Sequence, residues 1–493
     1  MAAVKYLLFL IPLCLFGLGS LHAREFSVVT YNVENLFDVD EVAVYSDYRA
    51  DRPDEPFAYS REKLWTKLDN ITRVLAKVND GAGPEVILFN ELEGDFTPES
   101  GAGEDKAAFL DEFADTTVEA MLGEEWKPEY AGYSAADWLL KAMADAGMTG
   151  YEVAVAPAKP EEDVVAHVNA LFSRFPIEQV EFHPIEQARD ILEARLDVDD
   201  EPLWIYGNHW KSGASNPDRE RIRLENARVL REELDARLAA DPSADVVVAG
   251  DLNSHYNHDL LFPEIETGIN DVLGAQGDET FGDDADLYNL WFELPPADRY
   301  SEVWRGRRGS LMHLIVSPGL YDDSGISYVD ESFEVLKYPG LNADQIGRPL
   351  SWSFAGRTGG GFSDHFPIMA RFSTRPFERT APPSEGDDAL DYEMPLGYSE
   401  EQDLDLEAGD FLGGIGDAEL GPYVGKLYAV EARVVQAEPI RLKVGDDRWS
   451  AYSFDPSIRE ALREAVGAER ELNLVVSLGI WKDRRQFIVE GIR

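Results

Sequence analysis

A nine-residue stretch near the middle of the chain, Asp245–Asn253 (DVVVAGDLN), places the strongest limit on the fold. Its three consecutive valines predict a fully buried strand, and Gly250 allows a sharp exit from that strand. Asp251 and Asn253 stand two positions apart, so in extended chain both side chains point to the same side. A carboxylate and an amide placed there can orient a water molecule and bind a phosphate oxygen. Taken alone, the stretch is better explained as a strand followed by an Asx turn. Other fragments of the chain are needed to choose between this turn and a phosphate-binding site.

Other polar residues also stand at the ends of predicted strands. The strand predicted at Phe26–Tyr31 runs directly into YNVEN, and the strands in PEVILFNELEG and EPLWIYGNHWKSG end in polar residues as well. A strand pair is predicted at 151–156 and 169–173, and helices at about 59–78 and 218–238. Strands and helices alternate without a strict βαβ repeat. The pattern therefore predicts a layered α/β sandwich rather than a barrel.

The length of 493 residues is too great for one ordinary hydrophobic core, which predicts two domains. The first is predicted at 24–374. An acidic stretch rich in Pro and Gly at 375–420 is predicted to be a linker that few contacts cross. At 421–493, three strand patterns, a short helix and two more strands follow the order of an OB-type β-barrel.

The first residues, 1–23, have the composition of a cleaved secretory signal peptide. A lysine precedes an apolar run from Tyr6 to Leu18, and Leu21-His22-Ala23 resembles a cleavage site. The alternative is a membrane anchor, but the run is short for a span of about 20 residues. The only cysteine, Cys14, lies inside this run, so the mature protein is predicted to contain no cysteine. The signal peptide predicts a secreted or periplasmic protein, and we expect a monomer.

The formal net charge of −49 limits the class of partner. Removing the signal peptide takes away Lys5 alone, which leaves about −50. Such a surface repels polyanions at long range, and salt or divalent cations screen it. The charge therefore counts against a salt-insensitive, nonspecific DNA-binding protein. It fits an exported protein in a salty medium, although acidity also keeps a protein soluble in general.

Five short fragments, YNVEN, FNELEG, GNHWKS, GDLNSH and FSDHFP, occur in this order between about Phe26 and Phe372. Together they resemble the endonuclease/exonuclease/phosphatase superfamily, whose members are DNase I-like. Each fragment is weak alone, but the order and the position at strand ends are specific. The flanking pieces YNVENLFD, NHWKSG and RYSEVWRG are most similar to an exported bacterial nuclease-like branch.

The resemblance implies a four-layer α/β sandwich with a divalent-metal phosphoesterase site at one end. Glu91 would be the main metal carboxylate, helped by Asn32 and Glu34, and Asp364 would be a second one. Hard oxygen ligands suit Mg²⁺, with Mn²⁺ or Ca²⁺ as substitutes.

Two histidines and the central stretch would carry the chemistry. Asp251 would position or deprotonate the attacking water, and Asn253 would hold that water and a phosphate oxygen. His209 and His365 would flank the phosphorus, stabilise charge and protonate the leaving oxygen. The residues predicted to contact substrate are Asn169 and Asn208.

One position departs from the family pattern. The family usually has an Asp before the strand HLIVS that orients the histidine of the SDH motif, and this chain has Met312 there. Without that carboxylate, His365 is expected to be poorly oriented and to titrate near or below its usual pKa of about 6.5. Either another acid substitutes, activity is reduced, or the site has another role. Because the other matched residues remain, we expect an active enzyme.

Three functions compete at this stage. The first is an exported nuclease whose barrel binds single strands, with Trp449, Tyr452 and Phe454 either stacking on bases or filling the barrel core. The second is a phosphatase or lipid phosphodiesterase acting on a small anionic headgroup, which the acidic surface slightly favours. The third is a catalytically weakened binding protein, which the methionine and the added barrel suggest.

Overall fold

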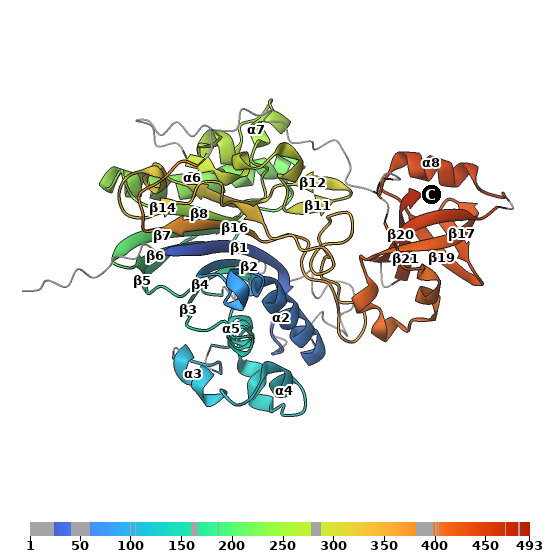
Figure 1. Cartoon of the computed structure of the whole chain (residues 1–493), viewed down its shortest axis with the longest axis horizontal. Coiled ribbons are helices and arrows are strands. Elements are labelled where there is room, and N and C mark those ends of the chain that lie inside the picture. The colour runs from blue at the N-terminus through green and yellow to red at the C-terminus, as the bar shows by residue number, and fades with distance from the viewer. Residues whose placement is uncertain are drawn as a thin grey trace, which may run out of the picture.

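The computed structural model describes residues 24–40, 60–98, 100–103, 105–158, 166–185, 187–277, 287–380, 398–399, 402, 404–468, 470–481 and 484–493 (Figure 1). The predicted signal peptide 1–23 and the 381–397 part of the predicted linker lie outside these residues. Within them, no helix combines the length and the apolar character that crossing a bilayer requires.

Two seven-stranded sheets form the first domain. The first sheet has the order β14-β16-β1-β2-β4-β3, and β15 also pairs with β16. The second has the order β5-β6-β7-β8-β13-β10-β9. The first comprises β14 (Ser327–Tyr328), β16 (Ile368–Ser373), β1 (Glu25–Leu36), β2 (Val86–Glu93), β4 (His167–Ser173), β3 (Glu152–Val155) and β15 (Glu334–Val335). The second comprises β5 (Ile177–His183), β6 (Ile191–Val198), β7 (Glu201–His209), β8 (Val246–Asp251), β13 (Met312–Val316), β10 (Leu287–Asn289) and β9 (Ala275–Gln276).

The sheets stack face to face with helices outside, which gives the predicted four-layer sandwich (Figure 1). The valines of β8 show how the sequence builds it. Val247 belongs to the apolar core between the sheets, whereas Val246 and Val248 pack under α6 (Pro217–Ala240). On the other side, α2 (Arg61–Leu75) and α5 (Ala135–Asp145) cover the first sheet. A strand buried on both faces needs apolar residues at successive positions, which explains the valine run.

Most predicted elements of the sandwich are present. The pair predicted at 151–156 and 169–173 is the antiparallel pair β3–β4, and the helix predicted at 218–238 is α6. The helix predicted from about Tyr59 begins after an N-cap at Ser60, whose side chain accepts from the amide of Lys63. Strand β5 is not predicted because its mixed polar and apolar residues give no clear alternation. Strand β6 is not among the predicted elements either, although its residues from Leu192 to Val198 alternate between apolar and charged.

The C-terminal strands close into a five-stranded barrel of order β17-β18-β19-β21-β20. This is consistent with the predicted OB-like domain. Its strands are β17 (Leu427–Ala437), β18 (Ile440–Val444), β19 (Asp447–Tyr452), β20 (Leu472–Trp481) and β21 (Arg484–Ile492), with α8 (Pro456–Glu464) between β19 and β20. Trp449 is buried and stacks on Phe487 at 4.0 Å between ring centroids, so this tryptophan belongs to the barrel core and is not a stacking surface.

The barrel also contacts the sandwich. Arg348, in the loop between β15 and β16, forms ion pairs of 2.8 Å with Asp344 of its own domain and with Glu490 of β21. Ile346 packs with Leu427 and Val475 of the barrel. The predicted domain boundary at the linker stays a prediction, and these contacts join the two parts across it. The contacts come from an irregular loop, where apolar periodicity gives no signal.

We expect Arg348→Met to loosen the barrel from the sandwich, because it leaves Asp344 and Glu490 without their shared cation. Breaking a largely buried ion pair costs about 3 kcal/mol. Limited proteolysis should then cut the chain faster between the domains. The control is Arg441→Met, since the Arg441 side chain forms no ion pair among the described residues. Equal cleavage rates for both variants would contradict a docking role for Arg348.

Candidate active site

Asp251 lies at the centre of the site, where the two sheets meet at their ends. It is the last residue of β8, and its side chain is buried. Asn32 of β1 donates its amide to Asp251 Oδ2 and to Glu91 Oε1, both at 3.0 Å. The backbone amide of Asp251 donates to Asn90 Oδ1 of β2 at 3.0 Å. These bonds fix the end of β8 against the first sheet, as the position of polar residues at strand ends predicts.

Both predicted histidines face the same carboxylate oxygen. Nε2 of His209 lies 3.8 Å from Asp251 Oδ2, and Nε2 of His365 lies 3.7 Å from it. His365 Nε2 is also 3.8 Å from Asp364 Oδ1. Asn253 is close by, since its backbone amide donates to Asp251 Oδ1 at 2.9 Å. The structure thus brings together the four residues predicted to carry the chemistry.

Unusual backbone conformations hold these side chains in place. Glu34, Glu91 and Asn253 have φ values of 48°, 65° and 49°, in the left-handed region that non-glycine residues rarely adopt. Gly250 has φ of 126°, and a Cβ there would lie 2.0 Å from the carbonyl oxygen of Asn208. The glycine of GDLN is therefore required for the close approach of β7 and β8. Local strain of this kind concentrates at functional sites.

The three predicted metal carboxylates influence one another. Burial, followed by the nearby charge of Asp364, raises the pKa of both Glu34 and Glu91. Lys67 of α2 partly offsets this at Glu34, because its ammonium group is buried close to the carboxylates. Two buried carboxylates whose pKa is raised by burial and by a third negative charge gain from a divalent cation. The donor chemistry therefore fits a hard divalent metal ion.

The exact ligand set stays a prediction. Asn32 turns its amide nitrogen towards Glu91, and its side-chain oxygen accepts from the amide of Glu34. Among the described residues, acidic groups close enough to share an ion occur elsewhere, at Asp38, Asp40 and Glu93 and at Glu181, His183 and Glu193. Metal binding at the predicted site would thus require Asn32 or the carboxylates to adjust.

The two histidines have opposite protonation preferences. Burial, together with the positive charge of Arg189, lowers the pKa of His209 well below its usual value. Burial alone would also lower the pKa of His365, but the carboxylates of Asp364, Asp251 and Glu302 outweigh it and raise the pKa to about 9. At neutral pH the site therefore holds a neutral His209 and a charged His365, and the charged imidazole can act as a proton donor.

The expectation that His365 titrates near or below 6.5 is therefore wrong. The additional acid is Glu302 of β11 (Glu302–Trp304), whose backbone forms an antiparallel bridge with that of His365. Burial raises the pKa of Glu302 to about 7, and the charge of His365 acts against this rise. The orienting contact is still missing: Nδ1 of His365 is buried and has no hydrogen-bond partner among the described residues. Met312 is fully buried in the core between the sheets.

We expect Glu302→Gln to lower the pKa of His365 from about 9, because it removes one of the carboxylates that favour the imidazolium form. A histidine whose folded pKa exceeds its unfolded value of about 6.5 adds stability below that value, and this stability is lost as pH rises through 9. The variant should lose this stability at lower pH. NMR titration of the His365 ring in EDTA measures the shift, and an unchanged midpoint would contradict it.

Asn169 and Asn208 are placed differently from the other predicted residues. Both are fully buried. Asn169 donates to the carbonyl oxygens of Asp190 and Gly207, and Asn208 Oδ1 accepts from Trp210 Nε1 at 3.0 Å. Neither lines the pocket at the site. Contact of Asn169 and Asn208 with substrate stays a prediction, which this packing does not favour. The packing supports a role for both residues in positioning β4 and β7.

The open part of the site is a pocket of about 490 Å³. Glu34, Glu91, His209, Asn253, Asp364 and His365 line it, together with Arg189, Glu302, Trp304, Arg307 and Arg308. Sequence reasoning missed Arg189 and Lys67. A lysine in an amphipathic helix normally points to solvent, and Arg189 lies outside every matched fragment. Glu302 lies within the fragment RYSEVWRG, but nothing in that fragment predicts its effect on the pKa of His365.

Comparisons with known proteins found one family profile and a set of solved structures. The profile of the Endonuclease/Exonuclease/phosphatase family matches residues 171–374. No curated protein matches the sequence. Solved structures that resemble this one include a truncated Caenorhabditis elegans TDP2, with 12% identity, coverage of 71% of this chain and 97% of that chain, and a TM-score of 0.37.

Two bacterial structures are similar to the same extent. An endonuclease/exonuclease/phosphatase family protein from Bacteroides thetaiotaomicron has 13% identity, coverage of 74% and 99%, and a TM-score of 0.37. A beta toxin from Staphylococcus aureus has 13% identity, coverage of 70% and 99%, and a TM-score of 0.38. The profile match contains Asp251 and both site histidines. Residues 171–374 of the sandwich domain thus match the profile of the endonuclease/exonuclease/phosphatase family.

Proposed function

We propose that the protein is an exported phosphodiesterase that depends on a divalent metal ion, and that its substrate is a nucleic acid. The observation that carries the proposal is the shared contact of His209 and His365 with one oxygen of Asp251, beside the carboxylates of Glu91 and Asp364. Phosphodiester hydrolysis needs a base for water, a donor for the leaving oxygen and neutralisation of charge. This arrangement supplies all three.

The charge of each residue determines the role that it would have in the reaction. Asp251 is buried, which raises its pKa and makes it a stronger base for a water molecule than an exposed carboxylate. Asn253 lines the pocket next to it and would orient that water. The charged His365 would protonate the leaving oxygen, and the neutral His209 would donate a hydrogen bond to a phosphate oxygen.

A divalent ion, Mg²⁺ first and Mn²⁺ or Ca²⁺ as substitutes, would be held by Glu91 with Glu34 and Asp364 and would neutralise the charge of the phosphate. Arg189 lines the same pocket and would add positive charge near the phosphate. Export is supported by the composition of residues 1–23 and by the strongly acidic surface.

Hydrolysis of bis(p-nitrophenyl) phosphate by the mature chain, with Mg²⁺ and with EDTA, tests the core of the proposal. We expect release of nitrophenol that EDTA abolishes. A panel of single-stranded and duplex DNA, RNA, phospholipids and phosphosugars then identifies the substrate class. The limited volume of the pocket, about 490 Å³, favours a small anionic headgroup as the second candidate. Activity on phospholipids without activity on nucleic acids would select that candidate.

A further inference from the structure

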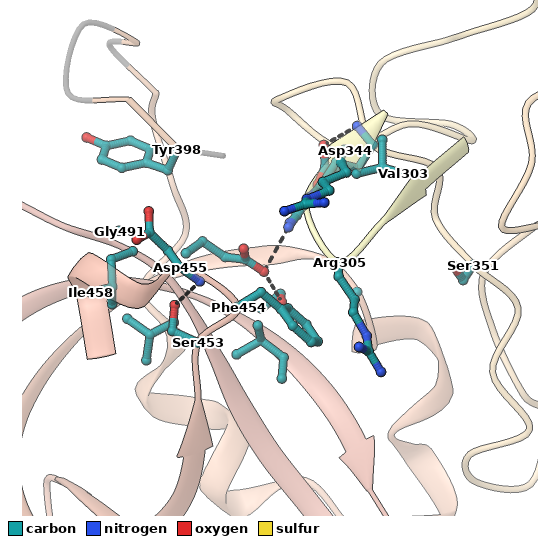
Figure 2. Close-up of a pocket in the computed structure, with 18 of the residues that line it drawn as sticks. Val303, Arg305, Asp344, Ser351, Tyr398, Ser453, Phe454, Asp455, Ile458 and Gly491 are labelled. Carbon is teal, nitrogen blue, oxygen red and sulfur yellow. Dashed lines mark hydrogen bonds and ion pairs between the residues drawn. The ribbon is translucent and has the colours of Figure 1, made fainter. Parts of the chain in front are cut away.

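A second cleft, of about 1080 Å³, lies between the sandwich and the barrel (Figure 2). On the sandwich side it is lined by the turn of the β11–β12 hairpin, where β12 is Arg307–Gly309, and by the loop that carries Arg348. On the barrel side it is lined by the turn from β19 to α8, which carries Phe454, and by Ile480 of β20. Figure 2 shows Arg305 and Phe454 on opposite sides of this cleft.

The β11–β12 hairpin lies between this cleft and the active-site pocket. Arg307 lines both, whereas Glu302 and Trp304 of the same hairpin line the active-site pocket. The two cavities therefore meet at one hairpin. A ligand longer than the active-site pocket can therefore reach the interdomain cleft by passing over this hairpin.

The hairpin turn is positively charged in a chain whose net charge is −49. It contains Arg305, Arg307 and Arg308, and among the described residues no carboxylate forms an ion pair with Arg305. Its guanidinium lies 5.3 Å from the ring centre of Trp304 instead. An arginine kept away from acids in so acidic a protein indicates a place for an anionic ligand.

The acidic residues that line the cleft are already engaged. Asp344 and Glu490 share Arg348, and Asp455 caps α8 by accepting from the amide of Ser457 at 2.7 Å. The carboxylates therefore repel an anion less than their number suggests.

The cleft also exposes flat apolar surface. Phe454 is 43% exposed and lines the cleft, and Trp304 is 62% exposed beside the active-site pocket. Exposed rings next to arginines bind unpaired bases by stacking, whereas the bases of a duplex are already stacked on each other. A lipid headgroup or a phosphosugar would use neither the rings nor the length of the cleft.

We propose that a single-stranded nucleic acid runs from the active-site pocket over the β11–β12 turn into the interdomain cleft, with phosphates at Arg305 and Arg307 and a base stacked on Phe454. This inference rests on the proposed function and names the form of nucleic acid that the site takes. The barrel then selects long single strands without touching the reacting atoms.

The test compares a 20-nucleotide single strand with bis(p-nitrophenyl) phosphate, using the full mature chain. We expect Arg305→Ala and Phe454→Ala each to raise the KM for the single strand about tenfold, because one stacked base or one phosphate contact is lost. Neither should change hydrolysis of the small diester. Phe454→Tyr, which keeps a ring, should behave like the parent. Arg433→Ala removes the same charge from an exposed position of β17 outside the cleft and should have no effect.

Unchanged KM for the single strand in both variants, or an equal change for a duplex of the same sequence, would overturn the inference. Failure of the parent to hydrolyse either substrate would instead count against the proposed function. In that case, fluorescence anisotropy of the labelled 20-mer in EDTA decides the inference separately. Binding that weakens about tenfold in Phe454→Ala supports it, and no binding, or equal binding by parent and variant, overturns it.

Discussion

Glu91→Gln should reduce metal-dependent hydrolysis by about a thousandfold, since charge stabilisation by a metal ion is worth several kcal/mol in such reactions. Glu91 stands at the meeting point of the site: it accepts from Asn32, lies 3.9 Å from His209 Nε2 and faces the charge of Asp364. A neutral amide is a poor ligand for a hard cation. Turnover of bis(p-nitrophenyl) phosphate measures the loss.

The melting temperature of Glu91→Gln in EDTA should stay equal or rise although its activity falls. Burial, with the charge of Asp364, raises the pKa of Glu91, so its ionised form costs stability at pH 7 in the metal-free protein. The glutamine should therefore melt at the same temperature or higher in EDTA, while the stabilisation by Mg²⁺ seen in the parent is lost. Glu225→Gln, on the exposed face of α6, is the matched control. A full Mg²⁺-induced shift in Glu91→Gln would exclude Glu91 as a ligand.

The sequence predicts the sandwich and the main contacts of the site well, because both depend on strand ends. The run in DVVVAGDLN is buried on both faces, and parallel pairing of β7 with β8 places His209 directly beside Asp251. Fragments separated by hundreds of residues thus converge, since the strands that carry them are neighbours in a sheet or face each other across the core.

The sequence could not predict features that depend on packing between irregular segments. Glu302 reaches His365 through a single backbone bridge, and no spacing rule links residues 302 and 365. Lys67 looks like a surface residue of an amphipathic helix, yet its ammonium group donates to the carbonyl of Phe362 beside the carboxylates. The docking of the barrel through Arg348 also comes from a loop. In each case the contact joins residues that are far apart in the sequence, so no local pattern predicts it.

Met312 bears on two separate properties of His365, the pKa of its ring and the orientation of that ring. The family pattern predicts that an Asp at this position would orient His365 and raise its pKa. The surrounding carboxylates already raise that pKa to about 9, so the electrostatic part of the expectation no longer applies. The orienting part remains, because Nδ1 of His365 has no partner among the described residues. Met312 pairs directly with Asp251 across β13 and β8, which puts both side chains on the face that looks into the site.

We therefore expect Met312→Asp to raise turnover about tenfold or more by fixing the His365 ring, since an orienting Asp is worth orders of magnitude in other hydrolases. The pH profile should move little, because His365 is already charged at neutral pH. The new carboxylate replaces an apolar side chain that is fully buried, which costs several kcal/mol unless the imidazolium pairs with it. Met312→Asn supplies an acceptor without charge and should give a smaller rise in turnover with a smaller loss in melting temperature. If both variants fold and keep the parent's rate, the orientation of His365 does not limit the reaction.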